Sequence, residues 1–273
     1  MPYCKWVPRK RGQHNILAAY ARNITSQCGE DGILEHIFKI IPDRNRHCVE
    51  FGAWDGKYLS NVWNLTRNHG WKALFIEANP HRFRKLQANH RDNPRAICLN
   101  RLVQYAGPNS LDRILHEVGF PKDVDLVSID IDGNDWYIWQ SLSVYRPKVV
   151  LIEFNPTIPN DVVYLQERDP SVNQGCSLLA LIHLAGRKGY ELIATTPWNA
   201  FFVRKEWFPL FKIKDNSIDA MYDDSQYGMR IFQLFDGTLT LTGTKRLLWH
   251  NIPIPDEAIQ VLPPHARRFP DRL

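Results

Sequence analysis

The amino-acid sequence predicts an α/β fold with a doubly wound, mostly parallel sheet whose last strand is antiparallel. Two observations favour the parallel part: short apolar strands alternate with helical segments, and the strands end in polar side chains. A third observation favours the antiparallel strand, because residues 195–199 are too short a connection for a parallel crossover. We expect a core over residues 24–205, with extensions at residues 1–23 and 206–273.

The first expected helix has apolar side chains at helical spacing over residues 33–41, stops at Pro42, and has the acidic residues of segment 26–32 at its start. A strand at residues 47–51 then enters a glycine-containing turn. The next strands are expected at residues 73–76, 95–99, 126–129 and 149–152, and the polar residues after them are Glu77, Asn100, Asp130 and Glu153. Segments 80–90 and 111–118 between these strands have helical composition. The alternation predicts helices on both faces of the sheet.

The end of the core and the C-terminal extension complete the expected order. A helix over residues 177–188 closes at Gly189, and strands at residues 190–194 and 200–203 form the antiparallel pair. In the extension, β-type segments 232–235 and 238–241 flank Asp236 and Gly237, which predicts a hairpin. A parallel sheet that ends in such a turned-back strand is the architecture of class I S-adenosylmethionine-dependent methyltransferases.

The composition of the 273 residues excludes several classes of protein. With 44% hydrophobic and 23% charged residues, the chain can bury a full core. No run approaches the roughly 20 apolar residues of a membrane span, and the first residues lack the apolar region of a secretory signal. Five cysteines without a CxxC pair suit reduced thiols and a cytoplasmic location. The net charge of +5 is spread along the chain, so nucleic acid is not expected as a partner.

The turn at residues 50–56 carries the strongest chemical signal. Its glycines let the backbone approach a ligand at the carboxyl edge of the sheet, where open α/β sheets bind their ligands. Glu77 follows Gly56 by about 20 residues and ends the next strand, where a carboxylate can accept both hydroxyls of an adenosine ribose. Either feature alone is an ordinary tight turn or surface glutamate, but together they predict an adenosine-containing ligand.

Acidic and amide side chains follow the next two strands. Asp130 and Asp132 end one strand, and Glu153 and Asn155 end its neighbour. Hard divalent cations bind such oxygens, so these four residues are candidate ligands of Mg²⁺, which would lower the pKa of a substrate hydroxyl. Without a metal, Asp130, Asp132 or Glu153 could act directly as a general base. We also expect one or two acids of segment 130–135 to serve only as helix caps.

Four tryptophans lie near the expected site, at positions 54, 136, 139 and 198. Most tryptophans belong to cores, but one or two could stack on adenine or on a sugar ring. The ten histidines form no HxH or HExxH pattern, so no catalytic histidine is expected.

Five segments together resemble the FkbM-type methyltransferases. They are SQCGEDG at residues 26–32, VEFGAWDG at 49–56, SIDIDGND at 128–135, IEFN at 152–155 and NAFFV at 199–203. The resemblance covers about residues 25–205. It implies a class I fold, S-adenosylmethionine as the methyl donor, and methylation directed at oxygen on sugars or natural products.

The resemblance also implies site residues. It places Glu50, Gly52, Asp55, Gly56 and Glu77 at the donor, and Asp130 at the donor or acceptor side. We add Asn100, which ends the third strand, to the residues expected at the donor. The sequence departs from the broad class I pattern at Trp54, which stands where a middle glycine often occurs.

These observations lead to an expected function and two alternatives. We expect an O-methyltransferase acting on a hydroxyl of a sugar, glycan or natural-product scaffold, with or without a divalent metal. Residues 130–132 also match the metal-binding DxD of a glycosyltransferase that uses a nucleotide sugar, although that alternative leaves the glycine turn and Glu77 unexplained. The second alternative is an adenosine-binding module without catalytic activity.

Overall fold

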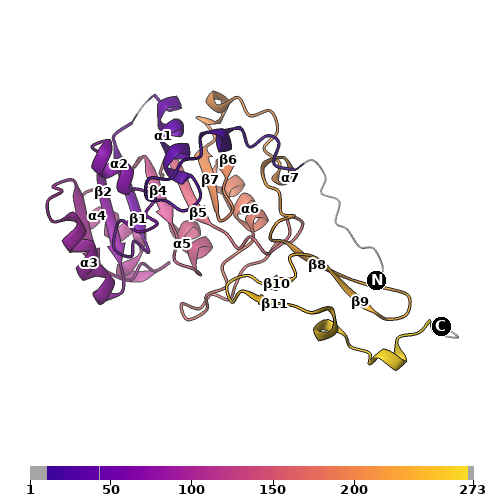
Figure 1. The fold of residues 1–273 in the computed structure, drawn as a ribbon. Coiled ribbons are helices and arrows are strands. Elements are labelled where there is room, and N and C mark those ends of the chain that lie inside the picture. The colour runs from indigo at the N-terminus through magenta and orange to yellow at the C-terminus, as the bar shows by residue number, and fades with distance from the viewer. Residues whose placement is uncertain (1–10, 43, 270–273) are drawn as a thin grey trace.

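The computed structural model describes residues 11–42 and 44–269, which form an α/β core and a C-terminal arm (Figure 1). Seven strands build the central sheet of the core. They are β1 (His47–Phe51), β2 (Lys72–Glu77), β3 (Ala96–Asn100), β4 (Leu126–Ile129), β5 (Val149–Glu153), β6 (Tyr190–Thr195) and β7 (Asn199–Arg204). Their order across the sheet is β3-β2-β1-β4-β5-β7-β6.

The strand directions confirm the predicted fold class. Strands β1 to β5 pair in parallel, whereas β7 is antiparallel to both of its neighbours, β5 and β6. The short connection between β6 and β7 forces this reversal. A sheet with this order and one reversed strand is the class I methyltransferase fold.

Helices cover both faces of the sheet. They are α1 (Glu30–Ile40), α2 (Trp63–Asn68), α3 (Pro80–His90), α4 (Leu111–Glu117), α5 (Asp135–Ser141) and α6 (Leu178–Lys188), with a short α7 (Ile218–Met221) after the core. Alternate side chains of a strand point to opposite faces. Cys48 of β1 therefore packs in the cluster that contains α1, α2 and α3, whereas Val49 packs in the cluster that contains α4, α5 and α6.

The first helix begins at Glu30, with the acidic Glu30 and Asp31 in its first turn, as expected. Gly29 precedes it with a φ of +99°, and a Cβ at Gly29 would lie 2.4 Å from the Ala21 Cβ. A segment that contains the 3₁₀ helix η1 (Ile16–Tyr20) thus crosses closely over the start of α1. Helix α6 ends as expected at Gly189, which has a φ of +76°.

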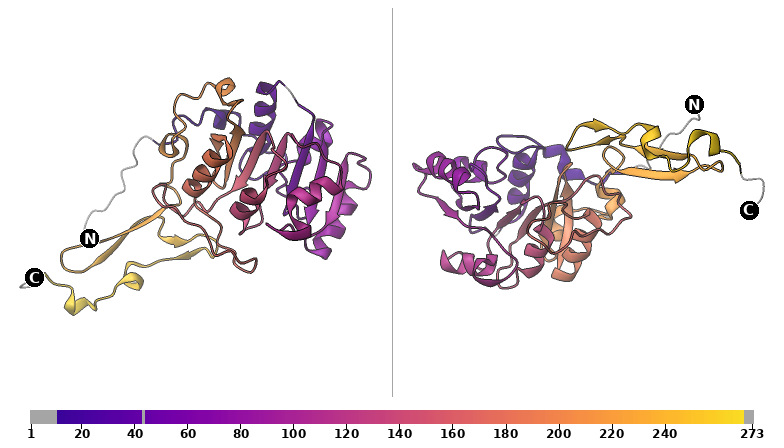
Figure 2. Two further views of the ribbon diagram at one scale, coloured as in Figure 1. Left: turned by 180° about the vertical axis from the view of Figure 1, so that it is seen from behind. Right: turned by 90° about the horizontal axis from the view of Figure 1, so that it is seen from below.

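The C-terminal arm projects away from the core (Figure 2). It contains an antiparallel pair, β8 (Met229–Gln233) and β9 (Leu239–Gly243), a second short pair, β10 (Arg246–Leu247) and β11 (Ile252–Pro253), and the 3₁₀ helices η4 (Asp256–Ile259) and η5 (Pro264–Ala266). The hairpin bends at the expected Asp236 and Gly237, but its loop covers residues 234–238, so the strands lie further apart along the sequence than expected. Among residues 11–42 and 44–269, no helix is long and apolar enough to cross a membrane.

Candidate functional site

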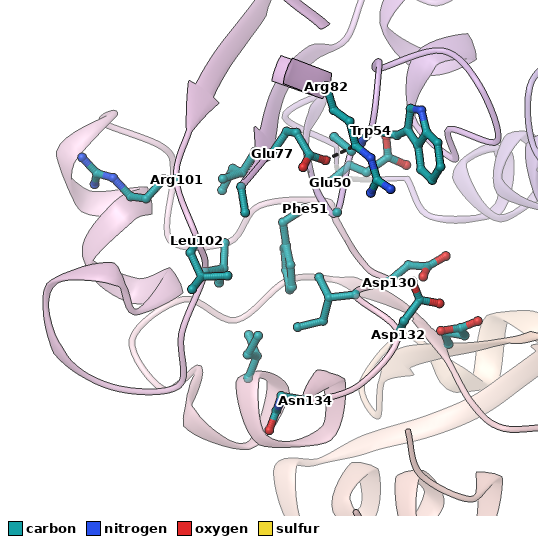
Figure 3. A pocket seen from close by; sticks show the side chains of 18 of the residues that line it. Glu50, Phe51, Trp54, Glu77, Arg82, Arg101, Leu102, Asp130, Asp132 and Asn134 are labelled. Atoms are coloured by element: carbon teal, nitrogen blue, oxygen red, sulfur yellow. Dashed lines mark hydrogen bonds between the residues drawn. The ribbon is translucent and has the colours of Figure 1, made fainter. Parts of the chain in front are cut away.

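One cavity of about 400 Å³ lies at the carboxyl ends of the parallel strands (Figure 3). The loops that follow β1, β2, β3 and β4 contribute to its wall, and Glu153 at the end of β5, Pro170 and Asn173 from the segment between β5 and α6, and Gln27 complete it. Six of the residues predicted from the sequence line this cavity: Glu50, Gly52, Glu77, Asp130, Asp132 and Glu153.

The glycine turn and Glu77 are directly connected. The Trp54 N–H donates a hydrogen bond to Glu77 Oε2 (2.8 Å), and the Asn79 N–H donates one to Oε1 (2.7 Å). Glu77 is buried and its side chain lines the cavity. Because a carboxylate oxygen has two lone pairs, each oxygen of Glu77 can accept one further hydrogen bond.

Gly52 joins the turn after β1 to the end of β4. Its φ is +73°, and a Cβ at this position would lie 1.9 Å from the carbonyl oxygen of Asp130. No side chain fits in that space, so the sequence requires glycine here. The close approach fixes the glycine turn against the loop that carries Asp130 and Asp132.

Glu50, at the carboxyl end of β1, lies buried beside the cavity. Ser60 Oγ donates to Glu50 Oε2 (2.6 Å), and the Asn61 N–H donates to Oε1 (2.7 Å). Burial raises the pKa of Glu50 to about 7, since desolvation outweighs these two hydrogen bonds and the Asp31 charge adds to it. Glu50 therefore gains or loses its proton close to neutral pH.

Three carboxylates meet on the other side of the cavity. Asp130, Asp132 and Glu153 each place one oxygen within 4.8 Å of the others. Asp132 has a φ of +57°, a strained conformation for a residue with a side chain. Strain of this kind gathers at functional sites, and here it turns the Asp132 carboxylate into the cluster.

Asp130 and Glu153 share a hydrogen bond and titrate together. Desolvation, followed by the negative charges of Asp135 and Asp132, raises the pKa of Asp130. Desolvation and the Asp130 charge raise the pKa of Glu153. Because two carboxylates at this separation repel each other, each favours the protonated form of the other.

Asp135 has a different role from its acidic neighbours. Its side chain accepts hydrogen bonds from the N–H groups of Ile131 (2.9 Å) and Gly133 (2.8 Å), and so closes the loop at the start of α5. Burial raises the pKa of Asp135 to about 6. Asp135 thus has a structural role, because its hydrogen bonds fix the loop that carries Asp130 and Asp132 in the cavity wall.

Four other predicted residues lie outside the cavity wall. Asp55 accepts hydrogen bonds from the backbone of Lys57 and Tyr58 within its own turn. A Cβ at Gly56 would lie 2.3 Å from Leu86, so its glycine is required by packing against α3. Asn100 donates to the carbonyls of Glu77 and Ala78, and Asn155 bonds with Thr157 and Gln174. These contacts shape the loops around the cavity.

Of the four tryptophans, Trp54 alone lines the cavity. It is 43% exposed, and the Arg82 guanidinium lies 3.6 Å from the centre of its ring. Trp136 and Trp139 are buried on α5. Trp198 contacts Tyr227 and Trp249 where the arm meets the core.

Gln27 and Arg82 are cavity residues that the sequence did not single out. Gln27 belongs to the SQCGEDG segment, whose Asp31 Oδ2 accepts hydrogen bonds from the N–H groups of residues 24, 25 and 26. The segment itself was the available signal for Gln27. Arg82 lies in a polar helix without any motif, so only its place in the fold reveals it.

Neither the protein-family models nor the curated proteins contain a match to this sequence. Solved structures similar to this chain include the CMeT domain of the citrinin polyketide synthase, with 11% identity, 64% of this chain covered and a TM-score of 0.43. This chain spans about half (51%) of that structure. A SAM-dependent methyltransferase from Aquifex aeolicus has 9% identity over 62% of this chain and 86% of its own, with a TM-score of 0.39.

The glycopeptide N-methyltransferase MtfA, complexed with S-adenosyl-L-methionine, is also similar. The two share 13% identity over 66% of this chain and 94% of MtfA, with a TM-score of 0.39. All three TM-scores are below 0.5, so the fold assignment depends on the strand order of the sheet.

Proposed function

We propose that this chain is an S-adenosylmethionine-dependent O-methyltransferase of the FkbM type, acting on a hydroxyl of a sugar, glycan or natural-product scaffold. One observation carries the proposal: a single cavity has Glu77 and the glycine turn on one side and the Asp130, Asp132 and Glu153 carboxylates on the other. Such a cavity can hold a methyl donor on one side and the acceptor on the other.

The side formed by Glu77 and the turn after β1 would hold the donor. Glu77 is fixed by two backbone N–H groups and keeps lone pairs for the two ribose hydroxyls. Trp54 and Arg82 offer flat surfaces beside it for a nucleoside base. The bound donor supplies an electrophilic methyl group on a sulfonium.

The side formed by Asp130 and Glu153 would activate the acceptor. The acceptor oxygen attacks the methyl carbon, the carbon–sulfur bond breaks, and its electron pair remains on sulfur. The acceptor proton passes to the carboxyl pair, whose raised pKa values make it a better base than an ordinary carboxylate near neutral pH. The cavity contributes alignment and removal of water, which supply much of the rate in such displacements.

A divalent cation is a second way to use the same carboxylates. Asp130, Asp132 and Glu153 provide three oxygens within 4.8 Å, which is a donor set that suits Mg²⁺. Bound there, the cation would lower the pKa of the acceptor hydroxyl. Asn155 is less suited to the set, because its side-chain oxygen already accepts two hydrogen bonds from Thr157.

A transfer assay tests the proposal. The purified chain is incubated with methyl-labelled S-adenosylmethionine and a panel of glycans and small hydroxylated metabolites, with and without EDTA. We expect label on an acceptor oxygen; loss of transfer in EDTA, restored by Mg²⁺, would assign the cation route. In parallel, thermal shifts compare S-adenosylhomocysteine with UDP-sugars. Stabilisation by UDP-sugars alone would overturn the proposal in favour of a glycosyltransferase.

A further inference from the structure

The C-terminal arm contains a sheet with little support of its own. In the described part of the chain, β8 and β9 pair only with each other. A two-stranded ribbon is marginally stable in water and presents unpaired backbone groups at its edges. The arm projects away from the core (Figure 2), and Arg230 near the start of β8 forms an ion pair with Asp161 of the core (2.9 Å).

The two edges of the ribbon differ. At the β9 edge, the side chain of Gln260 bonds with both the N–H (3.0 Å) and the carbonyl oxygen (2.8 Å) of Leu239. A Cβ at Gly237 would lie 2.6 Å from Leu262, which shows how closely the following segment crosses this end. The arm therefore covers part of its own β9 edge.

The β8 edge is open. The hydrogen bonds from Leu234 N to Thr238 O and from Thr244 N to Gly228 O show which facing residue pairs of the hairpin are hydrogen-bonded and which are not. Ile231 pairs with Leu241 at a position between bonded pairs, so its N–H and C=O point away from β9. Across residues 11–42 and 44–269, no group outside the hairpin forms a hydrogen bond with the backbone of Ile231.

The arm is also unusually apolar on its surface. Its exposed large hydrophobic residues are Ile231, Phe232, Phe235, Leu247, Trp249, Ile252, Val261, Leu262 and Phe269. Phe235 is 89% exposed and Ile231 is 56% exposed. Over the whole arm these side chains expose roughly 1,000 Å², and a stable interface takes about 800 Å² from each partner.

Two ion pairs of the arm lie within the arm itself. Lys245 pairs with Asp256 (2.9 Å) and Arg267 pairs with Glu257 (2.7 Å), both within the arm. Apolar surface is typical of interfaces between identical subunits. A strand that pairs antiparallel with its own copy is also self-complementary about a twofold axis.

We propose that β8 pairs with β8 of a second copy of this chain, so that two arms form one four-stranded antiparallel sheet. The twofold axis passes beside Ile231, whose outward N–H and C=O bond with those of Ile231 in the second copy. The pairing closes both open edges and buries the apolar side chains of the two arms against each other. The inference does not depend on methyl transfer.

Sedimentation or light scattering of the purified full chain tests the pairing. At about 10 µM we expect a mass of twice 31.8 kDa for the wild type. I231P removes the outward N–H but none of the bonds to β9, and I231K places two like charges at the axis. Both variants should halve the mass. V144K is the matched control, because Val144 is an equally exposed apolar residue on the core, and it should remain a dimer.

Two further readouts keep the test decisive. Unchanged circular dichroism and thermal unfolding of the core show that the Ile231 variants are folded, and hydrogen exchange at Ile231 should be slow in the wild type and fast in I231K. A monomeric wild type, which would leave the arm to a different partner, overturns the proposal. A wild-type dimer that persists in folded I231P overturns it too, because the contact would then lie elsewhere.

Discussion

The two sides of the cavity differ in how their carboxylates are satisfied. On the β1–β2 side, Glu77 and Glu50 each accept two hydrogen bonds from fixed neighbours. On the β4–β5 side, Asp130 and Glu153 face each other and raise each other's pKa. The carboxylates of the first side are held in place before any ligand arrives. The second needs a proton or a cation, which makes it the place where charge moves in the proposed reaction.

The largest effect is expected from removing the charge on the β4–β5 side. D130N and E153Q should each lower kcat by about 10²- to 10⁴-fold, because the acceptor proton loses its base. Affinity for S-adenosylhomocysteine should change little, since neither residue belongs to the donor side. Initial rates and calorimetry measure the two quantities. Wild-type kcat in both variants would remove the carboxyl pair from the mechanism.

The connection between the two sides can be broken at Gly52. G52A places a Cβ 1.9 Å from the Asp130 carbonyl oxygen, whereas G119A has a similar positive φ and no atom within 4 Å. In both variants the positive φ of the new alanine costs about 1 kcal/mol of folding stability. Only G52A adds the steric clash. We expect G52A to be less stable than G119A by about 3 kcal/mol or to fail to fold. Denaturant unfolding measures the difference, and equal stability would contradict the geometry.

The β1–β2 side is tested at Glu77. E77A should weaken S-adenosylhomocysteine binding by about 10- to 100-fold, because the ribose hydroxyls lose a charged acceptor. D112A is the matched control: Asp112 also accepts backbone hydrogen bonds, from residues 143–145, but lies outside the cavity wall. D112A should lose stability and keep its affinity. If both variants bind equally well, Glu77 does not hold the donor.

A smaller, pH-dependent effect is expected at Glu50. Its pKa rises from about 4.5 to about 7 on folding, so the folded state holds its proton more tightly than the unfolded state. The wild type therefore loses stability as the pH rises between these values, by at most about 3 kcal/mol. E50Q lacks this titration, so its stability relative to the wild type should increase from pH 5 to pH 8. Thermal unfolding without ligand measures it, and a pH-independent difference would contradict the pKa.

The fold could be predicted from the sequence because strands β2 to β5 are mostly apolar runs that end at a polar residue or are followed by one. The reversal of β7 followed from a short connection alone. The acidic start of α1 was also predicted, and the positive φ of Gly29 and a crossing segment fix where the helix begins. The projection of the arm could not be predicted, because it depends on tertiary contacts and not on a local sequence pattern.

Within the site, the carboxyl ends of parallel strands brought Asp130 and Glu153 together, as their positions after neighbouring strands suggested. Sequence could not separate acids that face the cavity from acids that hold a loop. Asp135 and Asp55 accept backbone hydrogen bonds, whereas Asp132 reaches the cluster through a positive φ. The difference arises from turn conformation, which the residue types alone do not determine.

The central claim is that one cavity binds the donor before any acceptor is present. Calorimetric titration of S-adenosylhomocysteine into the wild-type chain tests it most directly. We predict saturable binding at one site per chain, weakened in E77A. A chain that takes up neither S-adenosylhomocysteine nor S-adenosylmethionine would contradict the account.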